Sequence, residues 1–202
     1  MKQIFIEALF LLFVTFFGLF LYTYKLDQIP KGFYIDEALP GYNAYSLLQT
    51  GKDEYGKFFP IALRFYGSYN PPLYTLSVIP GIKYIGLNVF AVRYPAAIFG
   101  SLAIIVVFYF LKNIKLFKSR LIPFLGATFF AISPWNFFYS RIGYEVGLAF
   151  LLFSTGVLFC YLSLKKKYYF PLGLLFLSSS TYAAYTQRFI VTIFILAFLL
   201  LF

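Results

Sequence analysis

The sequence predicts an all-α integral membrane protein, and three observations support this prediction. Hydrophobic residues make up 61% of the 202 residues and charged residues only 12%, which is more apolar than the core of a soluble domain requires. The mean hydropathy is +0.81. Apolar stretches recur from end to end, and several reach the roughly 20 residues that a helix needs to cross a bilayer. The expected fold is therefore a multi-pass helical bundle.

The formal net charge of +10 raises the question of a nucleic-acid partner. The basic residues, however, stand mainly in short clusters between the apolar stretches. Charges in such positions usually set membrane topology and contact anionic lipid headgroups. We therefore expect a lipid bilayer as the partner and no nucleic acid.

The basic clusters also indicate how many of the seven apolar stretches cross the membrane. Seven crossings would place the clusters at 112–120 and 165–167 on the side opposite the N-terminus, against the positive-inside tendency. The stretch 73–87 is the weakest candidate because it is short and is interrupted by Pro80 and Gly81, so we expect it to lie along or dip into the outer surface. Six crossings remain, with a cytoplasmic N-terminus and a long outer loop at 25–88. They are expected at 4–24, 89–111, 121–134, 145–164, 168–186 and 189–202.

The outer loop contains the segment YIDEALPGYNAYSLLQTGKDEYG, in which Asp36 and Glu37 are adjacent. Asp36 is a suitable N-cap for an amphipathic helix that ends at Gly51. The tyrosine-rich face of that helix would rest on the membrane interface. The simplest interpretation is that Asp36 caps the helix and Glu37 is solvated. The alternative is acid–base chemistry at the membrane surface, which is compatible with capping.

Several motifs occur in a fixed order along the chain. They are the acidic pair at Asp36, the helix start NPPLYTL, the run AVRYPAAIFGSLAIIVVFYFL, the segment SPWNFFYSRIGYEVGLAF and an arginine at the head of a later helix, Arg188. In this order the chain resembles the N-terminal part of the dolichyl-phosphate-mannose protein mannosyltransferases (glycosyltransferase family 39, GT-C superfamily), which are related to the lipid A aminoarabinose transferases. The resemblance covers almost the whole chain. It implies a GT-C-like bundle with amphipathic juxtamembrane helices in the first outer loop, and residues 1–202 as one polytopic domain that forms part of a larger module.

The resemblance implies a membrane glycosyltransferase that works at the outer face of the cytoplasmic membrane. It would transfer a sugar, with inversion, from a polyprenyl-phosphate-linked donor to a hydroxyl group of a protein, lipid or cell-envelope glycan. Asp36 would be the general base that takes the proton of the acceptor hydroxyl, and Glu37 is a second catalytic candidate. Partial desolvation at the interface would make such a carboxylate more basic.

Glu145 is the third catalytic candidate. It begins an apolar run, and a carboxylate at the edge of the hydrocarbon region is unfavourable unless it is paired or faces an aqueous cavity. The resemblance implies an acidic residue at this place, where the aminoarabinose transferases carry aspartate. Arg141 stands four residues earlier, a spacing that lets two side chains meet on one helical face. A structural pair between Arg141 and Glu145 is therefore the alternative.

The leaving phosphate of the donor needs cationic partners, because negative charge develops on it. The outer arginines are the candidates for substrate binding, since a guanidinium matches phosphate oxygens. They are Arg64, Arg93, Arg141 and Arg188, with Arg64 and Arg188 preferred. The alternative for each is that it anchors a helix end by snorkelling. Asn70 stands where several relatives carry a basic residue, and it could hydrogen-bond a phosphate or a sugar hydroxyl without neutralising charge.

A divalent metal ion is the one cofactor that the sequence leaves open. The chain has no histidine, so a His-containing zinc site within it is excluded. The carboxylates of Asp36, Glu37 and Glu145 could still hold a hard divalent cation.

Two other function classes compete with the enzyme. In a transporter or flippase fragment, Glu145 and Arg141 would line a substrate path and Asp36 would be structural. The other class is a noncatalytic membrane assembly subunit. The polar residues gather in the predicted outer loops, whereas a transporter usually places polar groups or broken helices near the bilayer midplane. This distribution favours the enzyme.

Overall fold

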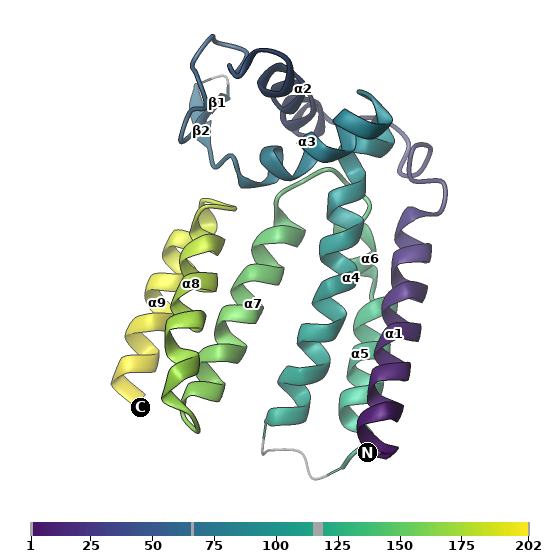
Figure 1. Ribbon diagram of the computed structural model, residues 1–202, viewed down its shortest axis with the longest axis vertical. Coiled ribbons are helices and arrows are strands. Elements are labelled where there is room, and N and C mark those ends of the chain that lie inside the picture. The colour runs from purple at the N-terminus through teal and green to yellow at the C-terminus, as the bar shows by residue number, and fades with distance from the viewer. Residues whose placement is uncertain (1, 66, 115–118, 202) are drawn as a thin grey trace.

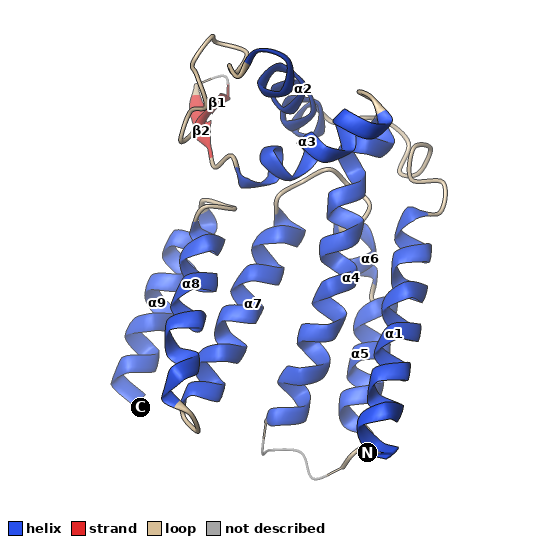
Figure 2. Ribbon diagram, in the orientation of Figure 1, coloured by secondary structure: helices blue, strands red, loops and turns tan. Residues whose placement is uncertain are grey.

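The computed structural model describes residues 2–65, 67–114 and 119–201 (Figure 1). Within them it contains nine α-helices, one short 3-10 turn and one two-stranded hairpin. The mostly helical fold confirms the prediction from composition. The hairpin, β1 (Leu63–Phe65) with β2 (Ser68–Asn70), was not predicted and stands out from the helices in Figure 2.

Six helices run side by side as an array (Figure 1). They are α1 (Lys2–Thr23), α4 (Val89–Asn113), α5 (Ile122–Ile132), α7 (Val146–Ser163), α8 (Phe170–Thr181) and α9 (Thr186–Leu201). In the described part of the chain, α1, α4 and α7 are long and apolar enough to cross a membrane, whereas α5 and α9 are shorter apolar helices. Both chain ends lie at the same end of the array (Figure 1).

The predicted boundaries differ from the structure at the last two crossings. The stretch 168–186 was expected to be one helix, but residues 167–169 form a 3-10 turn, α8 ends at Thr181 and α9 already begins at Thr186. The N–H of Tyr182 bonds back to the carbonyls of Ser179 and Ser180. This tight last turn ends α8 even though apolar residues continue beyond it.

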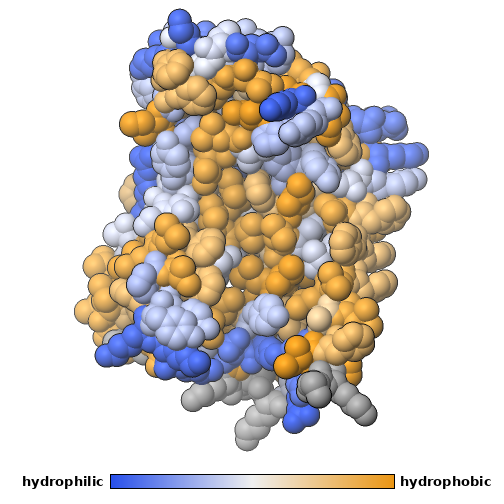
Figure 3. Space-filling view, in the orientation of Figure 1, coloured by the Kyte–Doolittle hydropathy of each residue, from blue (hydrophilic) through white to orange (hydrophobic). Residues whose placement is uncertain are grey.

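The remaining elements form a layer across one end of the array, which we call the cap layer (Figure 1). It consists of α2 (Ile35–Thr50), the hairpin and α3 (Leu73–Ile85). As expected for 73–87, α3 lies across the helix ends rather than along them. The short helix α6 (Pro134–Tyr139) joins α5 to the loop before α7. The space-filling view shows apolar side chains over the middle of the visible face and hydrophilic ones at both ends (Figure 3), which is the distribution that a bilayer selects.

For α2, the predicted C-terminal end is confirmed and the predicted N-cap is wrong. The stop at Gly51 is confirmed, because Gly51 has a φ of 70° and donates its N–H to the carbonyl of Leu47, the geometry of a left-handed helix C-terminus. The prediction that Asp36 is the N-cap is wrong, since Asp36 lies inside the first turn. The Oε2 of Glu37 instead accepts the N–H of Tyr34 at 3.2 Å. The neighbouring acidic residue thus supplies the cap.

The helix array is held together by apolar packing and by a few satisfied polar groups. A buried cluster between α1, α4 and α5 includes Ile104 and Phe108. Next to it the hydroxyl of Tyr22 donates to the carbonyl of Ala131 at 2.6 Å and accepts from Nδ2 of Asn136 at 2.8 Å. Buried polar groups are tolerated when they are paired in this way, so α6 is fixed against α1 and α5.

The contact between α7 and α8 depends on small residues and gives a first testable prediction. A Cβ atom added at Gly156 would lie 2.9 Å from the backbone nitrogen of Leu177, so we expect Gly156→Ala to force the helices apart and to cost about 1–3 kcal/mol. At Gly147, in the same helix, the nearest atom to an added Cβ lies at 3.8 Å, and Gly147→Ala is the matched control. Thermal unfolding in one detergent compares them. Equal melting temperatures would contradict the close contact.

Candidate functional site

A cavity of about 370 Å³ lies between the cap layer and the ends of the helix array. Residues from α2, the hairpin, the start of α3, the segment before α7 and the α8–α9 connection line it. Three of the predicted site residues are among them, namely Asp36, Asn70 and Glu145. Tyr144 and Tyr185 add aromatic and hydroxyl surface. Residues far apart in the sequence thus meet around one space.

Asp36 presents an unpaired carboxylate to this cavity. It lies in the first turn of α2, its side chain is exposed, and it lines the cavity wall. Among the residues that the structure describes, it takes part in no hydrogen bond and no ion pair. The free N–H groups at the start of a helix favour a negative charge nearby. Asp36 is therefore positioned to accept a proton from a molecule in the cavity.

Glu37 is in the opposite situation, although it is the next residue. It is 1% exposed, and its Oε1 accepts from Nε of Arg93 at 2.8 Å and from the N–H of Gly143 at 2.6 Å. Its Oε2 accepts from Nη2 of Arg93 at 2.9 Å and from the N–H of Tyr34. The solvated Glu37 of the simple interpretation does not occur, and the geometry gives Glu37 a structural part instead of the predicted catalytic one.

Arg93 is fully buried and has no donor left for a phosphate. Two of its five N–H groups bind Glu37. The other three donate to backbone carbonyls of the segment between α1 and α2, namely those of Leu26, Pro30 and Gly32. The structure thus replaces the predicted substrate contact with a buried ion pair that joins α4 to the start of α2.

Arg141 likewise binds the protein rather than a ligand. Its two Nη atoms donate to carbonyls at the end of α1 and just beyond it, at distances from 2.6 to 3.4 Å, and these carbonyls belong to Leu21, Tyr22, Tyr24, Lys25 and Ile29. The last carbonyls of a helix lack intrahelical donors, and a cation at this end is favourable. The predicted substrate contact and the alternative pair with Glu145 are both replaced by this helix-end contact.

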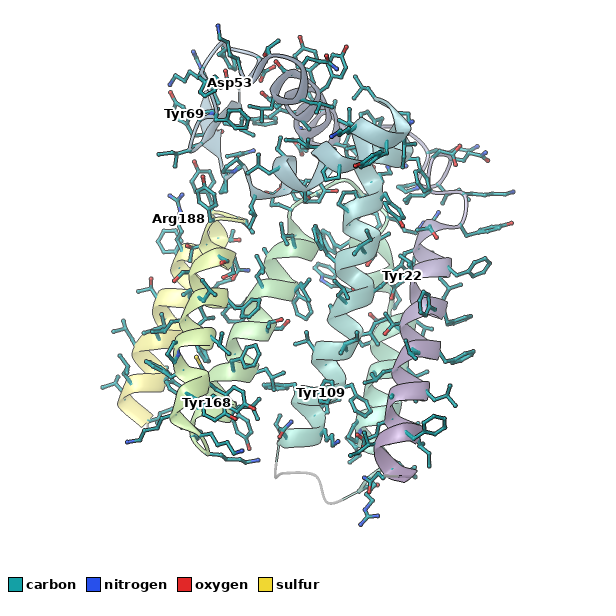
Figure 4. All side chains as sticks on the ribbon, in the orientation of Figure 1. Tyr22, Asp53, Tyr69, Tyr109, Tyr168 and Arg188 are labelled. Carbon is teal, nitrogen blue, oxygen red and sulfur yellow. The ribbon has the colours of Figure 1, made fainter. Side chains whose placement is uncertain are left out.

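The two arginines that were preferred for phosphate binding differ in their position relative to the cavity. Arg64 is exposed, and it alternates along β1 with Leu63 and Phe65, which line the cavity, so its side chain points to the other face of the hairpin. Its guanidinium lies 4.8 Å from the centre of the Tyr55 ring. Arg188 lies at the cap-layer end of α9, on the side of the molecule where the hairpin residue Tyr69 lies (Figure 4), and it follows the cavity-lining Thr186 by two residues. Arg188 therefore borders the cavity and Arg64 does not.

Tyr185 connects Arg188 to the cavity wall. The guanidinium of Arg188 lies 4.5 Å from the centre of the Tyr185 ring, and Tyr185 lines the cavity next to Thr186, the first residue of α9. A cation stacked on an aromatic ring keeps its N–H edges free for a ligand. Arg188 is thus the arginine that can meet an anion at this opening.

The charged side chains that line the cavity are the acidic ones of Asp36 and Glu145. Burial raises the pKa of the Glu145 carboxyl, and the negative charge of Asp36 raises it further. The charge of Glu145 raises the pKa of Tyr144, with burial and Asp36 adding to the effect. No Lys or Arg is among the described residues that line the cavity. Burial among these groups thus makes the Glu145 carboxyl harder to ionise than that of an exposed glutamate.

This raised pKa gives a prediction for stability against pH. A carboxyl whose pKa is higher in the folded state lowers stability as the pH rises from its ordinary value of 4.5 through the folded value. Glu145→Gln removes this penalty, so its melting temperature should exceed that of the wild type at neutral pH. The difference should vanish below pH 4.5. Thermal unfolding across pH measures it, with the exposed Asp27→Asn as control. A difference that is constant with pH would contradict the burial of Glu145.

The predicted set of three metal-binding carboxylates is not brought together. No three His, Cys, Asp or Glu side chains come close enough to hold a metal ion in the described part of the chain. The ion pair with Arg93 keeps Glu37 out of such a set. Asp36 and Glu145 remain at the cavity, with Asn70 as a further oxygen donor.

The sequence alone did not distinguish the two buried arginines, Arg93 and Arg141, from Arg188, which borders the cavity. One signal was present, because Arg93 and Arg141 stand in apolar surroundings, AVRYP and YSRIG, where a charge needs partners inside the protein. Arg188 instead follows the polar residues Thr186 and Gln187. Apart from Glu37, the hydrogen-bond partners of these two arginines are backbone carbonyls, which cannot be recognised from residue types.

No protein-family model matches the chain, and comparisons with curated proteins and with solved structures find no match either.

Proposed function

We propose that the chain is a membrane glycosyltransferase of GT-C-like architecture that uses a polyprenyl-phosphate-linked sugar. One observation carries the proposal: Asp36 offers an unpaired carboxylate to a cavity at the end of an apolar helix array. A lipid-linked donor holds its sugar at this depth, with its chain in the bilayer. In the proposed orientation the cap layer faces the outer side of the cytoplasmic membrane.

In the proposed reaction Asp36 is the general base. The hydroxyl oxygen of the acceptor attacks the anomeric carbon while its proton passes to the Asp36 carboxylate. The bond between the anomeric carbon and the phosphate oxygen breaks, and polyprenyl phosphate leaves with the bonding electrons. Attack from the side opposite the leaving group inverts the anomeric configuration. A positioned base of this kind contributes about 10²–10⁴-fold to a rate.

Other residues at or near the cavity would bind the donor and acceptor and hold Asp36 in position. Arg188 would meet the phosphate at the border of the cavity, because the described cavity wall itself has no cation. Asn70 lines the wall and would hydrogen-bond a sugar hydroxyl. Glu145, which burial favours in its protonated form, would donate a hydrogen bond to an oxygen of donor or acceptor. The buried pair of Glu37 and Arg93 would hold the first turn of α2 in place.

Transfer of labelled sugar from a polyprenyl-phosphate donor tests the proposal. Membranes that contain the chain are compared with membranes that contain Asp36→Asn at equal amounts of folded protein. Asp27→Asn is the matched control, because Asp27 is exposed and lies outside this cavity. We expect transfer by the wild type and the control and its loss in Asp36→Asn. Equal transfer by all three would contradict the base, and movement of the donor across the membrane without sugar transfer would favour the transporter.

A further inference from the structure

The segment 58–61 of the cap layer exposes three large apolar side chains in a row. Phe58 is 72% exposed, Phe59 54% and Ile61 80%, and Pro60 lies between them. The rings of Phe58 and Phe59 meet edge to face at a centroid distance of 5.1 Å. We call these four residues the apolar loop. A cluster of this size in water is unfavourable, and it usually marks a surface that contacts another apolar phase.

The apolar loop is held in one conformation by hydrogen bonds to two different elements. The N–H of Phe59 donates to the carbonyl of Gly51, at the end of α2, at 3.0 Å. The hydroxyl of Tyr182 donates to the carbonyl of Ile61 at 2.8 Å. The loop is therefore presented as a fixed apolar surface.

The bond from Tyr182 also places the loop beside the helix array. Tyr182 directly follows α8, and α9 begins four residues later. The hairpin that follows the loop lies next to the same ends of α8 and α9 in Figure 1. Phe189 and Ile193 on α9 are exposed as well. The apolar surface of the array thus continues into the apolar loop at the cap-layer end.

The residues around the loop have the composition of a membrane interface. Lys57 precedes Phe58 directly, and its ammonium lies 5.7 Å from the centre of the Tyr69 ring. Basic and aromatic side chains next to an apolar cluster favour the headgroup region, where the rings sit at the boundary and the cations meet lipid phosphate.

We propose that the apolar loop inserts into the headgroup and acyl boundary of the leaflet at the cap-layer end. Its partner is the lipid bilayer, because the loop extends the apolar surface of the helices that the bilayer already covers. The contact would fix the height and tilt of the cap layer over the membrane. This inference is independent of any enzymatic activity.

Tryptophan fluorescence tests the contact. The chain has a single tryptophan, so Trp135→Phe gives a background to which Phe58→Trp is added as the reporter. The protein is reconstituted in phosphatidylcholine vesicles with phosphatidylglycerol, with or without lipids brominated near the headgroup end of the acyl chains. We expect bromolipid to remove roughly half of the emission at position 58, as for a ring a few ångström below the headgroups, and aqueous acrylamide to quench it little.

Tyr55→Trp in the same background is the matched control from the same connection between α2 and the hairpin. Figure 4 shows Asp53, two residues earlier, in the part of the cap layer remote from the helix array, so we expect position 55 to respond to acrylamide and not to bromolipid. Ile61→Trp is a second reporter that should behave like Phe58→Trp. Acrylamide quenching of both reporters at the level of the control would overturn the proposal. Shielding that disappears as the protein is diluted in lipid would also overturn it and would point to a second copy of the chain.

Discussion

Arg93→Met is expected to cause the largest loss of stability, about 3–5 kcal/mol in the free energy of unfolding. The substitution leaves the carboxylate of Glu37 buried without its counter-charge, and three backbone carbonyls lose their donor. Arg64→Met is the matched control, because Arg64 is exposed and its replacement should stay within about 0.5 kcal/mol. Unfolding in detergent, followed by the fluorescence of Trp135 and by circular dichroism, measures both.

A double substitution separates the ion pair from simple loss of packing. Glu37→Met combined with Arg93→Met removes both charges at once. We expect the double variant to lose less stability than the sum of the two single variants, since replacing a whole buried pair by apolar groups is far less damaging than leaving one charge alone. Additive effects, or an Arg93→Met variant as stable as Arg64→Met, would show that this pair does not hold the cap layer.

Asp36→Asn is expected to have the largest effect on activity. Asparagine keeps the size of the side chain but cannot accept the proton of the acceptor, so kcat should fall by about 10²–10⁴-fold. KM for the donor should change little, because the carboxylate serves the acceptor rather than the phosphate. The melting temperature should stay near that of the wild type, since Asp36 has no hydrogen-bonding or ionic partner among the described residues.

Initial rates over a range of donor concentrations measure this effect. Asp36→Glu is the informative companion, because it retains a carboxylate and moves it by one methylene. We expect it to keep part of the activity that Asp36→Asn loses. A rise in KM with unchanged kcat in Asp36→Asn would instead indicate a binding role for Asp36.

Much of the fold could be predicted from the sequence, and the exceptions have physical causes. The helices follow from apolar stretches, and the stop of α2 follows from Gly51, whose lack of a side chain permits a positive φ. The hairpin was missed because strands of three residues are too short to show an alternating pattern. The division between α8 and α9 was predicted a few residues too late, because nothing in the run through Tyr182 and Ala183 marks the residue at which the backbone turns.

The candidate site could be predicted by residue type but not by role. Asp36, Asn70 and Glu145 were expected, and the structure brings them to one cavity. The assignment of Glu37 depends on partners 56 and 106 residues away, and adjacent carboxylates look alike in a sequence. Only the tertiary contacts show that one is bound inside the protein and the other faces the cavity.

One paired measurement tests the contrast between these adjacent carboxylates. Melting temperature and sugar transfer are determined side by side for Asp36→Asn and Glu37→Gln, prepared in the same detergent and lipid. We expect Asp36→Asn to keep the melting temperature and to lose transfer, and Glu37→Gln to lower the melting temperature because its bonds to Arg93 and Gly143 weaken. A stable Glu37→Gln without transfer beside a fully active Asp36→Asn would contradict it.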